Sequence, residues 1–239
     1  MNNICIIPAR GGSKRIPKKN IKNFRGHPII MWSIEAAKKS NQFNSIMVST
    51  DDHAIAQKAR ELGAEVPFMR PKEISDDYTD TRTVINYVID EMHKINIEYN
   101  FVCCLYATAP FVKPRDLEDA LKLIENKPDK AVYPVTKYSY PIQRALQRDK
   151  DGNTCFANKI NANTRSQDLE DMYHDAGQFY IASPKRWKQQ KNILEESTTL
   201  LLPNWRVQDI DNEEDWIRAE LLHSLLEEYD NQYGTDETE

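Results

Sequence analysis

Residues 3–25 read NICIIPARGGSKRIPKKNIKNFR, and this stretch decides the fold. Its first part, residues 3–9, is short and apolar, which predicts a buried β-strand. Residues 10–25 follow directly and contain two glycines and seven positive charges, with no negative one. A strand that opens into a glycine-bearing basic loop commonly holds phosphate at the carboxyl edge of a sheet.

The charge of this loop contrasts with the rest of the chain. The 239 residues have a formal net charge of −5, so the part outside residues 10–25 carries −12. The loop could be a solvated surface run, a nucleic-acid patch or a cradle for a nucleotide triphosphate. A nucleic-acid binder usually has a basic pI, whereas the pI here is about 5.7, so we expect no nucleic-acid partner. The Walker pattern is absent, because Lys14 is not followed by Ser or Thr.

Buried strands and amphipathic helices alternate along the chain. Apolar runs predict further strands at 45–49, 101–105 and 130–135. Helical spacing of apolar residues predicts helices at 28–40, 52–62, 84–95, 114–126 and 213–229. This alternation predicts an α/β fold with a largely parallel sheet flanked by helices. Ligands of such sheets bind beyond the carboxyl ends of the strands, where the basic loop lies.

The alternation stops between residues 138 and 172. This segment is polar, and its apolar residues are too few for a core of their own. We therefore expect a single domain over 1–239, with 138–172 as an inserted arm. The apolar residues of the arm that we expect to pack on a partner are Ile142, Leu146, Phe156 and Ile160. Residues 177–182 and 199–203 return to the sheet.

The sequence contains no signal for a membrane. No apolar run approaches the roughly 18–20 residues that span a bilayer. The apolar start of the chain is interrupted at Arg10, which does not fit a signal peptide. We expect a cytoplasmic protein without membrane contact.

A second constellation is the Asp209-Ile210-Asp211 segment. Side chains alternate along an extended chain, so the two carboxylates are expected on the same side. Such a pair suits a Mg²⁺ ion that also binds nucleotide phosphates. A D-x-D pattern is common by chance in a chain with 37 acidic residues. It becomes stronger evidence for a metal site when it lies opposite a basic phosphate loop. Asp51, after a predicted strand, is a weaker third candidate because it could equally cap a helix.

Several motifs, taken in order, resemble those of the CMP-sialic acid synthetases, cytidylyltransferases that activate sialic-type sugars. The most specific is the segment from Ile7 to Lys14 followed by Lys19-Asn20. The resemblance extends from residue 3 to about residue 225. Its further motifs are Val48-Ser49-Thr50-Asp51, Arg70-Pro71-Lys72-Glu73-Ile74, Thr108-Ala109-Pro110, Gly177 to Ile181 and Asp209-Ile210-Asp211.

The resemblance implies a Rossmann-like nucleotidyltransferase sheet, CTP as donor, Mg²⁺ as cofactor and a homodimer formed through residues 138–172. It implies that Asp209 and Asp211 bind the metal. The catalytic cations would be Arg10, Lys14 and Lys19, which hold the triphosphate. The remaining nucleotide-binding residues would be Ala9, Gly11, Gly12, Ser13, Asn20 and Arg70.

Departures from the family pattern bear on the sugar. Tyr106 replaces a glutamine that sialate synthetases usually carry, and His174-Asp175-Ala176-Gly177 replaces R-P-N-G. These replacements, with residues 140–146, resemble the branch that activates pseudaminic acid, a nine-carbon 2-keto acid with two acylamino groups. A different stereoisomer requires a different set of polar groups. The implied sugar-binding residues are Tyr106, Arg165, His174 and Gln178, with Arg165 facing the sugar carboxylate.

Two alternatives stay open. One is a synthetase for another sugar acid, namely N-acetylneuraminic acid, legionaminic acid or 3-deoxy-octulosonate. The other is a non-catalytic nucleotide-binding protein that keeps the fold. The presence of Lys19, Asp209 and Asp211 argues against the second, because such a protein has no use for metal ligands opposite a triphosphate loop.

Overall fold

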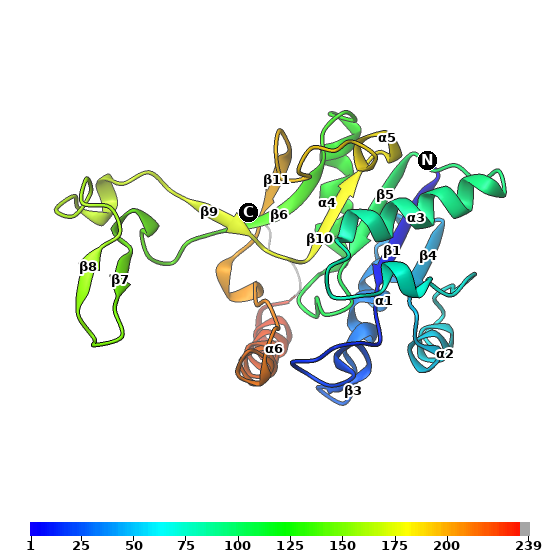
Figure 1. Cartoon of the computed structure of the whole chain (residues 1–239), viewed down its shortest axis with the longest axis horizontal. Helices are drawn as coiled ribbons and strands as arrows, with labels where there is room; N and C mark the ends of the chain where they lie inside the picture. Colours follow the sequence, from blue (N-terminus) through cyan, green and yellow to red (C-terminus); the bar gives the residue numbers. More distant parts are fainter. Residues whose placement is uncertain (235–239) are drawn as a thin grey trace.

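The computed structural model describes residues 1–234. Their centre is a seven-stranded mixed sheet with helices on both faces (Figure 1). The order is β11-β6-β10-β5-β1-β4, and β9 pairs with β6. β9 and β10 are antiparallel to their neighbours, while the other strands run in one direction. The strands are β1 (Asn3–Pro8), β4 (Ser45–Ser49), β5 (Phe101–Leu105), β6 (Val132–Lys137), β9 (Tyr173–Asp175), β10 (Phe179–Ala182) and β11 (Thr198–Leu201).

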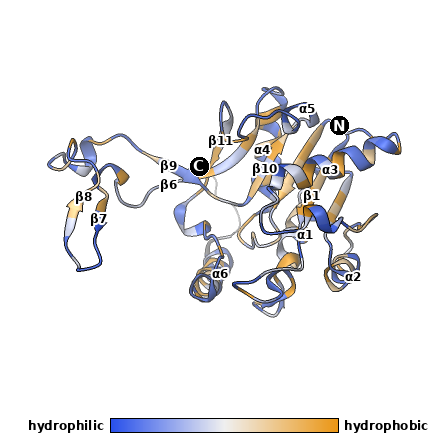
Figure 2. Cartoon of the chain, viewed as in Figure 1, coloured by the Kyte–Doolittle hydropathy of each residue, from blue (hydrophilic) through white to orange (hydrophobic). Residues whose placement is uncertain are grey.

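Both faces of β1 are buried, because successive side chains point to opposite sides of the sheet. Cys5 and Ile7 pack with α1 (Ile29–Lys39), α2 (His53–Glu61) and α4 (Pro114–Glu125). Ile4 and Ile6 pack with α3 (Thr81–Lys94) and α5 (Pro184–Trp187) on the other face. The strands form the hydrophobic centre of the molecule in Figure 2. This three-layer arrangement confirms the predicted α/β class.

The sequence predicted most of the helices and strands, but not the direction of every strand in the sheet. Asp52 caps α2 as expected, since its carboxylate accepts the backbone N–H groups of Ala54 and Ile55. The return strand at 177–182 is shorter than predicted and antiparallel to β5. β9 and the short pair β2 (Asn23–Phe24) and β3 (His27–Pro28) were not predicted, because two or three residues carry no readable periodicity.

A separate apolar cluster joins the two ends of the chain. The helix α6 (Glu213–Tyr233) is preceded by its N-cap residue Asn212, which forms a capping box with Asp215. Trp216 of α6 packs edge-on against Phe24, with ring centroids 5.5 Å apart. Ile16 of the basic loop and Ile210 of the aspartate segment are buried in the same cluster. This packing places the basic loop beside the aspartate segment.

Residues 138–172, the arm, extend away from the sheet and contain the hairpin of β7 (Leu146–Arg148) and β8 (Thr154–Phe156) (Figure 1). Tyr140 and Ile160 are 84% and 83% exposed, and Ile142 and Leu146 are also exposed. Phe156 is half-buried. The arm therefore has no core of its own, as its composition predicted. Among the described residues, no helix is long and apolar enough to cross a membrane.

Candidate active site

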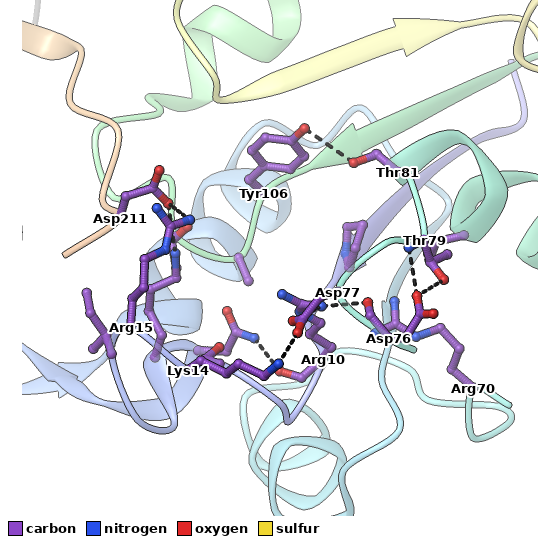
Figure 3. Close-up of a pocket in the computed structure, with 18 of the residues that line it drawn as sticks. Arg10, Lys14, Arg15, Arg70, Asp76, Asp77, Thr79, Thr81, Tyr106 and Asp211 are labelled. Carbon is purple, nitrogen blue, oxygen red and sulfur yellow. Dashed lines mark hydrogen bonds and ion pairs between the residues drawn. The ribbon is translucent and has the colours of Figure 1, made fainter. Parts of the chain in front are cut away.

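A cavity of about 280 Å³ lies beyond the carboxyl ends of β1 and β5, and we call it the basic cleft (Figure 3). Its position is the one expected for a ligand site in a sheet of this type. It collects most of the predicted nucleotide and metal residues into one site. The predicted residues that line it are Arg10, Ser13, Lys14, Lys19, Asn20, Arg70, Tyr106 and Asp211.

The start of the basic loop is held against the end of β4. The Gly11 N–H donates to Asp51 Oδ1 at 3.0 Å. A Cβ on Gly11 would lie 2.8 Å from the Cβ of Asp52, so only glycine fits at this position. Ala9 is buried, and its N–H donates to the Ser49 carbonyl. Ala9 and Gly11 therefore shape the loop rather than line the cleft, and Gly12 is exposed beside them.

Asn20 and Arg70 form the inner part of the cleft. The buried Asn20 side chain donates to the Arg10 carbonyl at 2.9 Å, which fixes the loop. Arg70 is buried, its Nε donates to Ser75 Oγ at 3.0 Å, and its Nη2 lies 3.7 Å from Asp51 Oδ1. Burial lowers the pKa of Arg70, and Asp51 opposes that effect.

The cations of the basic loop converge on two carboxylates. Arg10 and Lys14 both pair with Asp77, which the sequence analysis did not single out. Arg15 Nη2 lies 2.8 Å from Asp211 Oδ1. Figure 3 shows these two groups on either side of the cleft. Several cations gathered at one cleft suit a site for a compact polyanion.

Lys19 lies deeper than the other cations. Its Nζ donates to the Ile210 carbonyl at 2.7 Å and lies 4.0 Å from Asp211 Oδ1. Burial lowers the pKa of Lys19, and the Asp211 and Asp209 carboxylates partly offset that effect. Lys19 therefore connects the basic loop directly to the aspartate segment.

Ile210, which separates the two aspartates, is buried, and the two aspartates line different cavities. Asp211 lines the basic cleft, whereas Asp209 lines a neighbouring cavity of about 400 Å³. Burial and the Asp211 carboxylate raise the pKa of Asp209, and Lys19 opposes them. A divalent cation would relieve this repulsion between two carboxylates, so the donor chemistry fits Mg²⁺.

Asp209 and Asp211 do not form a complete metal site on their own. Within residues 1–234 no three His, Cys, Asp or Glu side chains are grouped to hold a metal. Mg²⁺ commonly uses one or two carboxylates and completes its shell with substrate phosphates and water. Asp51 binds the Gly11 N–H and lies beside Arg70, so its position is that of a loop anchor.

A third cavity, of about 440 Å³, shares Thr81 and Tyr106 with the basic cleft, and we call it the side cavity. The Tyr106 hydroxyl lies 3.3 Å from Thr81 Oγ1. Tyr180 donates to Asp175 Oδ2 at 2.5 Å, and burial raises the pKa of Tyr180 far above its ordinary value. Asp175 lines both the side cavity and the cavity of Asp209.

The predicted sugar-binding residues are spread over the molecule. Tyr106 separates the basic cleft from the side cavity, and His174 lines the cavity of Asp209. Gln178 is buried, and its amide donates to the Arg206 carbonyl at 2.8 Å. Arg165 is exposed on the arm and is not among the residues that line these three cavities.

The structure adds Arg15, Asp77, Thr81, Asp175 and Tyr180 to the site. Arg15 belongs to the basic loop and could have been selected with its neighbours. Asp175 lies in the motif at residues 174–177 and Tyr180 in a predicted strand, and neither pattern indicates a contact between them. Asp77 and Thr81 had no distinguishing signal, because their role depends on contacts with distant residues.

Comparison with known proteins agrees with this geometry. Residues 4–229 match the model of a protein family described as cytidylyltransferase. Pseudaminic acid cytidylyltransferase from Campylobacter jejuni is 41% identical over 230 residues, covering 95% of this chain and 99% of the relative. CMP-N,N'-diacetyllegionaminic acid synthase from Legionella pneumophila is 34% identical over 239 residues. The alignment covers 95% of this chain and 99% of the relative.

A solved structure shows the same fold. CMP:2-keto-3-deoxy-manno-octonic acid synthetase complexed with CTP superposes with a TM-score of 0.69 at 18% identity, over 95% of this chain and 100% of the other. The sequence likeness, the shared sheet and the cations collected at its carboxyl edge agree with one another. The chain therefore belongs to the cytidylyltransferase family, in the branch that the sequence motifs had indicated.

Proposed function

We propose that this protein transfers CMP from CTP to the anomeric hydroxyl of a nonulosonic acid, pseudaminic acid, and releases pyrophosphate. The observation that carries the proposal is the basic cleft, where Arg10, Lys14 and Lys19 lie opposite Asp211 at the carboxyl edge of the sheet. Its support for the sugar is the 41% identity to pseudaminic acid cytidylyltransferase over nearly the whole of both chains.

The reaction is a displacement at the α-phosphorus. The anomeric oxygen forms a new bond to phosphorus as the bond to the α,β-bridging oxygen breaks, and the hydroxyl proton is released. Negative charge moves onto the departing pyrophosphate, so cations placed around it stabilise the transition state. Arg10, Lys14 and Lys19 would supply that charge. Mg²⁺ held by Asp209 and Asp211 would neutralise further charge on the phosphates.

The side cavity is the proposed place of the sugar. It opens beside the basic cleft across Tyr106, so a molecule within it adjoins a nucleotide in the cleft. Its walls combine apolar surface from Tyr180, Trp187 and Ile193 with the carboxylate of Asp175. An acylamino group needs both kinds of surface, because its methyl is apolar and its N–H requires an acceptor.

The experiment is pyrophosphate release with CTP and a panel of sugar acids. We expect pseudaminic acid to be turned over faster than N-acetylneuraminic, legionaminic or 3-deoxy-octulosonic acid. A site built to bond particular polar groups rejects an isomer that leaves them unpaired. Equal efficiency with several sugars would refute the pseudaminate proposal, and no release with any of them would refute cytidylyl transfer.

A homodimer through the arm is part of the same proposal. The exposed apolar residues Ile142, Leu146 and Ile160 lack a core within the arm, so burial against a second copy in a two-fold interface would remove them from water. We expect a dimer in sedimentation at micromolar concentration. Ile142→Glu with Leu146→Glu should shift the equilibrium to the monomer.

Lys150→Glu is the control for this double variant. It reverses the charge of an exposed residue at the tip of the β7–β8 hairpin and should leave the dimer intact. A wild-type monomer at micromolar concentration would contradict the predicted interface. A dimer that persists in the double glutamate variant would place the interface elsewhere.

A further inference from the structure

The two outer cations of the basic cleft share one carboxylate from the opposite wall. Arg10 Nη1 lies 2.8 Å from Asp77 Oδ1, and Lys14 pairs with Asp77 Oδ2. Arg10 also donates to the Asp76 carbonyl at 2.5 Å. Each oxygen of the Asp77 carboxylate thus contacts a different cation, and Figure 3 shows the carboxylate between the two side chains. A phosphate group would meet the same two cations with two of its own oxygens.

Asp77 is presented by a locally ordered turn. The Asp76 carboxylate accepts the N–H groups of Tyr78 and Thr79 and the Thr79 hydroxyl. These bonds stay within the segment, so they do not depend on the basic loop. The hydrogen bond from Lys14 lowers the pKa of Asp77, which favours its ionised form. The contact of Asp77 with the basic loop can therefore break while the turn persists.

The pairing is accessible to a competing anion. The side chains of Lys14, Arg10 and Asp77 are 80%, 35% and 34% exposed, respectively. Exposed ion pairs contribute little stability and are screened by salt. Once phosphate occupies the two cations, Asp77 becomes a like charge beside it, which is unfavourable. The carboxylate and the phosphate therefore compete for Arg10 and Lys14.

We propose that Asp77 is an internal counter-ion that the phosphate chain of the nucleotide displaces, and that it promotes the release of pyrophosphate by competing for the same two cations. The identity of the nucleotide rests on the proposed function. A ligand that does not reach these cations leaves the contacts of Asp77 in place, so Asp77 does not affect its affinity. After transfer, Asp77 competes with pyrophosphate for Arg10 and Lys14 and shortens its residence.

Asp77→Asn tests this by a gain of affinity. Equilibrium titration should give dissociation constants for CTP and for pyrophosphate about three- to tenfold lower than in the wild type. Cytidine carries no phosphate, so its dissociation constant should not change. The difference for CTP should shrink as salt is raised, because the competing contacts are exposed. Pyrophosphate should also become a stronger product inhibitor in turnover.

Glu73→Gln is the matched control. Glu73 is an exposed carboxylate in the same part of the chain and does not line the basic cleft, so this variant removes the same net charge elsewhere. It should leave all three dissociation constants unchanged. If both variants tighten CTP equally, the effect is one of net charge and the proposal fails.

Weaker or unchanged CTP and pyrophosphate binding in Asp77→Asn would overturn the proposal, since Asp77 would then support the ligand or have no influence on it. Unfolding is monitored by the melting temperature, and unaltered cytidine binding confirms an intact nucleoside site. The titrations need no sugar acid. A failed sugar panel therefore contradicts the proposed function without deciding the role of Asp77.

Discussion

Lys19→Ala should lower kcat by about 10²-fold or more with CTP and the sugar acid. Lys19 is the cation that reaches the aspartate segment, through the Ile210 carbonyl at 2.7 Å. Its charge lies in a partly buried site, where electrostatic stabilisation of the leaving pyrophosphate is stronger than in water. The loss should appear in kcat more than in the KM for CTP, because charge develops on the leaving group in the transition state.

Lys18→Ala provides the control for this prediction. Lys18 is the adjacent lysine, it is exposed, and it does not line the basic cleft. The same loss of one positive charge should there change kcat little. Circular dichroism and the melting temperature should show that both variants fold. A folded Lys19→Ala protein with wild-type turnover would remove Lys19 from the catalytic group.

The second large effect is expected at the aspartates. Asp209→Asn and Asp211→Asn should each lower activity by at least about tenfold, and raised Mg²⁺ should partly restore it. The reason is that each variant removes one negative oxygen donor from a pair whose repulsion a cation relieves. Mg²⁺ titration of activity gives the concentration for half-maximal rate, which should rise in both variants.

The ion pairs of Asp211 require a separate control. Asp211 contacts Arg15 at 2.8 Å, so its substitution also frees that arginine, whereas Asp209 has no such contact among the ion pairs of the described chain. Arg15→Ala breaks the Arg15–Asp211 pair and keeps the carboxylate. It should leave the Mg²⁺ requirement unchanged. Full activity of the double asparagine variant at ordinary Mg²⁺ would show that the aspartates bind no metal.

The nucleotide side of the site was more predictable than the sugar side, and the reason is physical. Arg10, Lys14 and Lys19 lie in one continuous loop after a buried strand, so local sequence places them together at one edge of the sheet. Asp77 pairs with Arg10 and Lys14 from a turn more than sixty residues away, and only tertiary packing brings the two segments together. No periodicity in the sequence reports such a contact.

The places of the predicted sugar-binding residues in the structure could not be derived from the sequence. Gln178 precedes β10, is buried, and donates to the Arg206 carbonyl. Arg165 belongs to the arm, which has no apolar pattern to fix its position against the sheet. Asp175 and Tyr180 form a hydrogen bond at the side cavity, although their motifs indicate no role for either residue. The resemblance to the family indicated these residues as candidates, but it did not give the direction of their side chains.

The contact between Lys19 and Ile210 joins residues 191 positions apart in the chain. During translation, the basic loop leaves the ribosome long before Ile210, Asp211 and Trp216, which follow it in the chain by about as many residues. Until then Phe24 and Ile16 have no partner from α6, because their cluster requires Trp216 and Ile210. The basic cleft of a nascent chain is complete only after the segment from Ile210 to α6 has docked. A nucleotide can therefore bind only after Ile210, Asp211 and α6 have been synthesised and have packed against the earlier part of the chain.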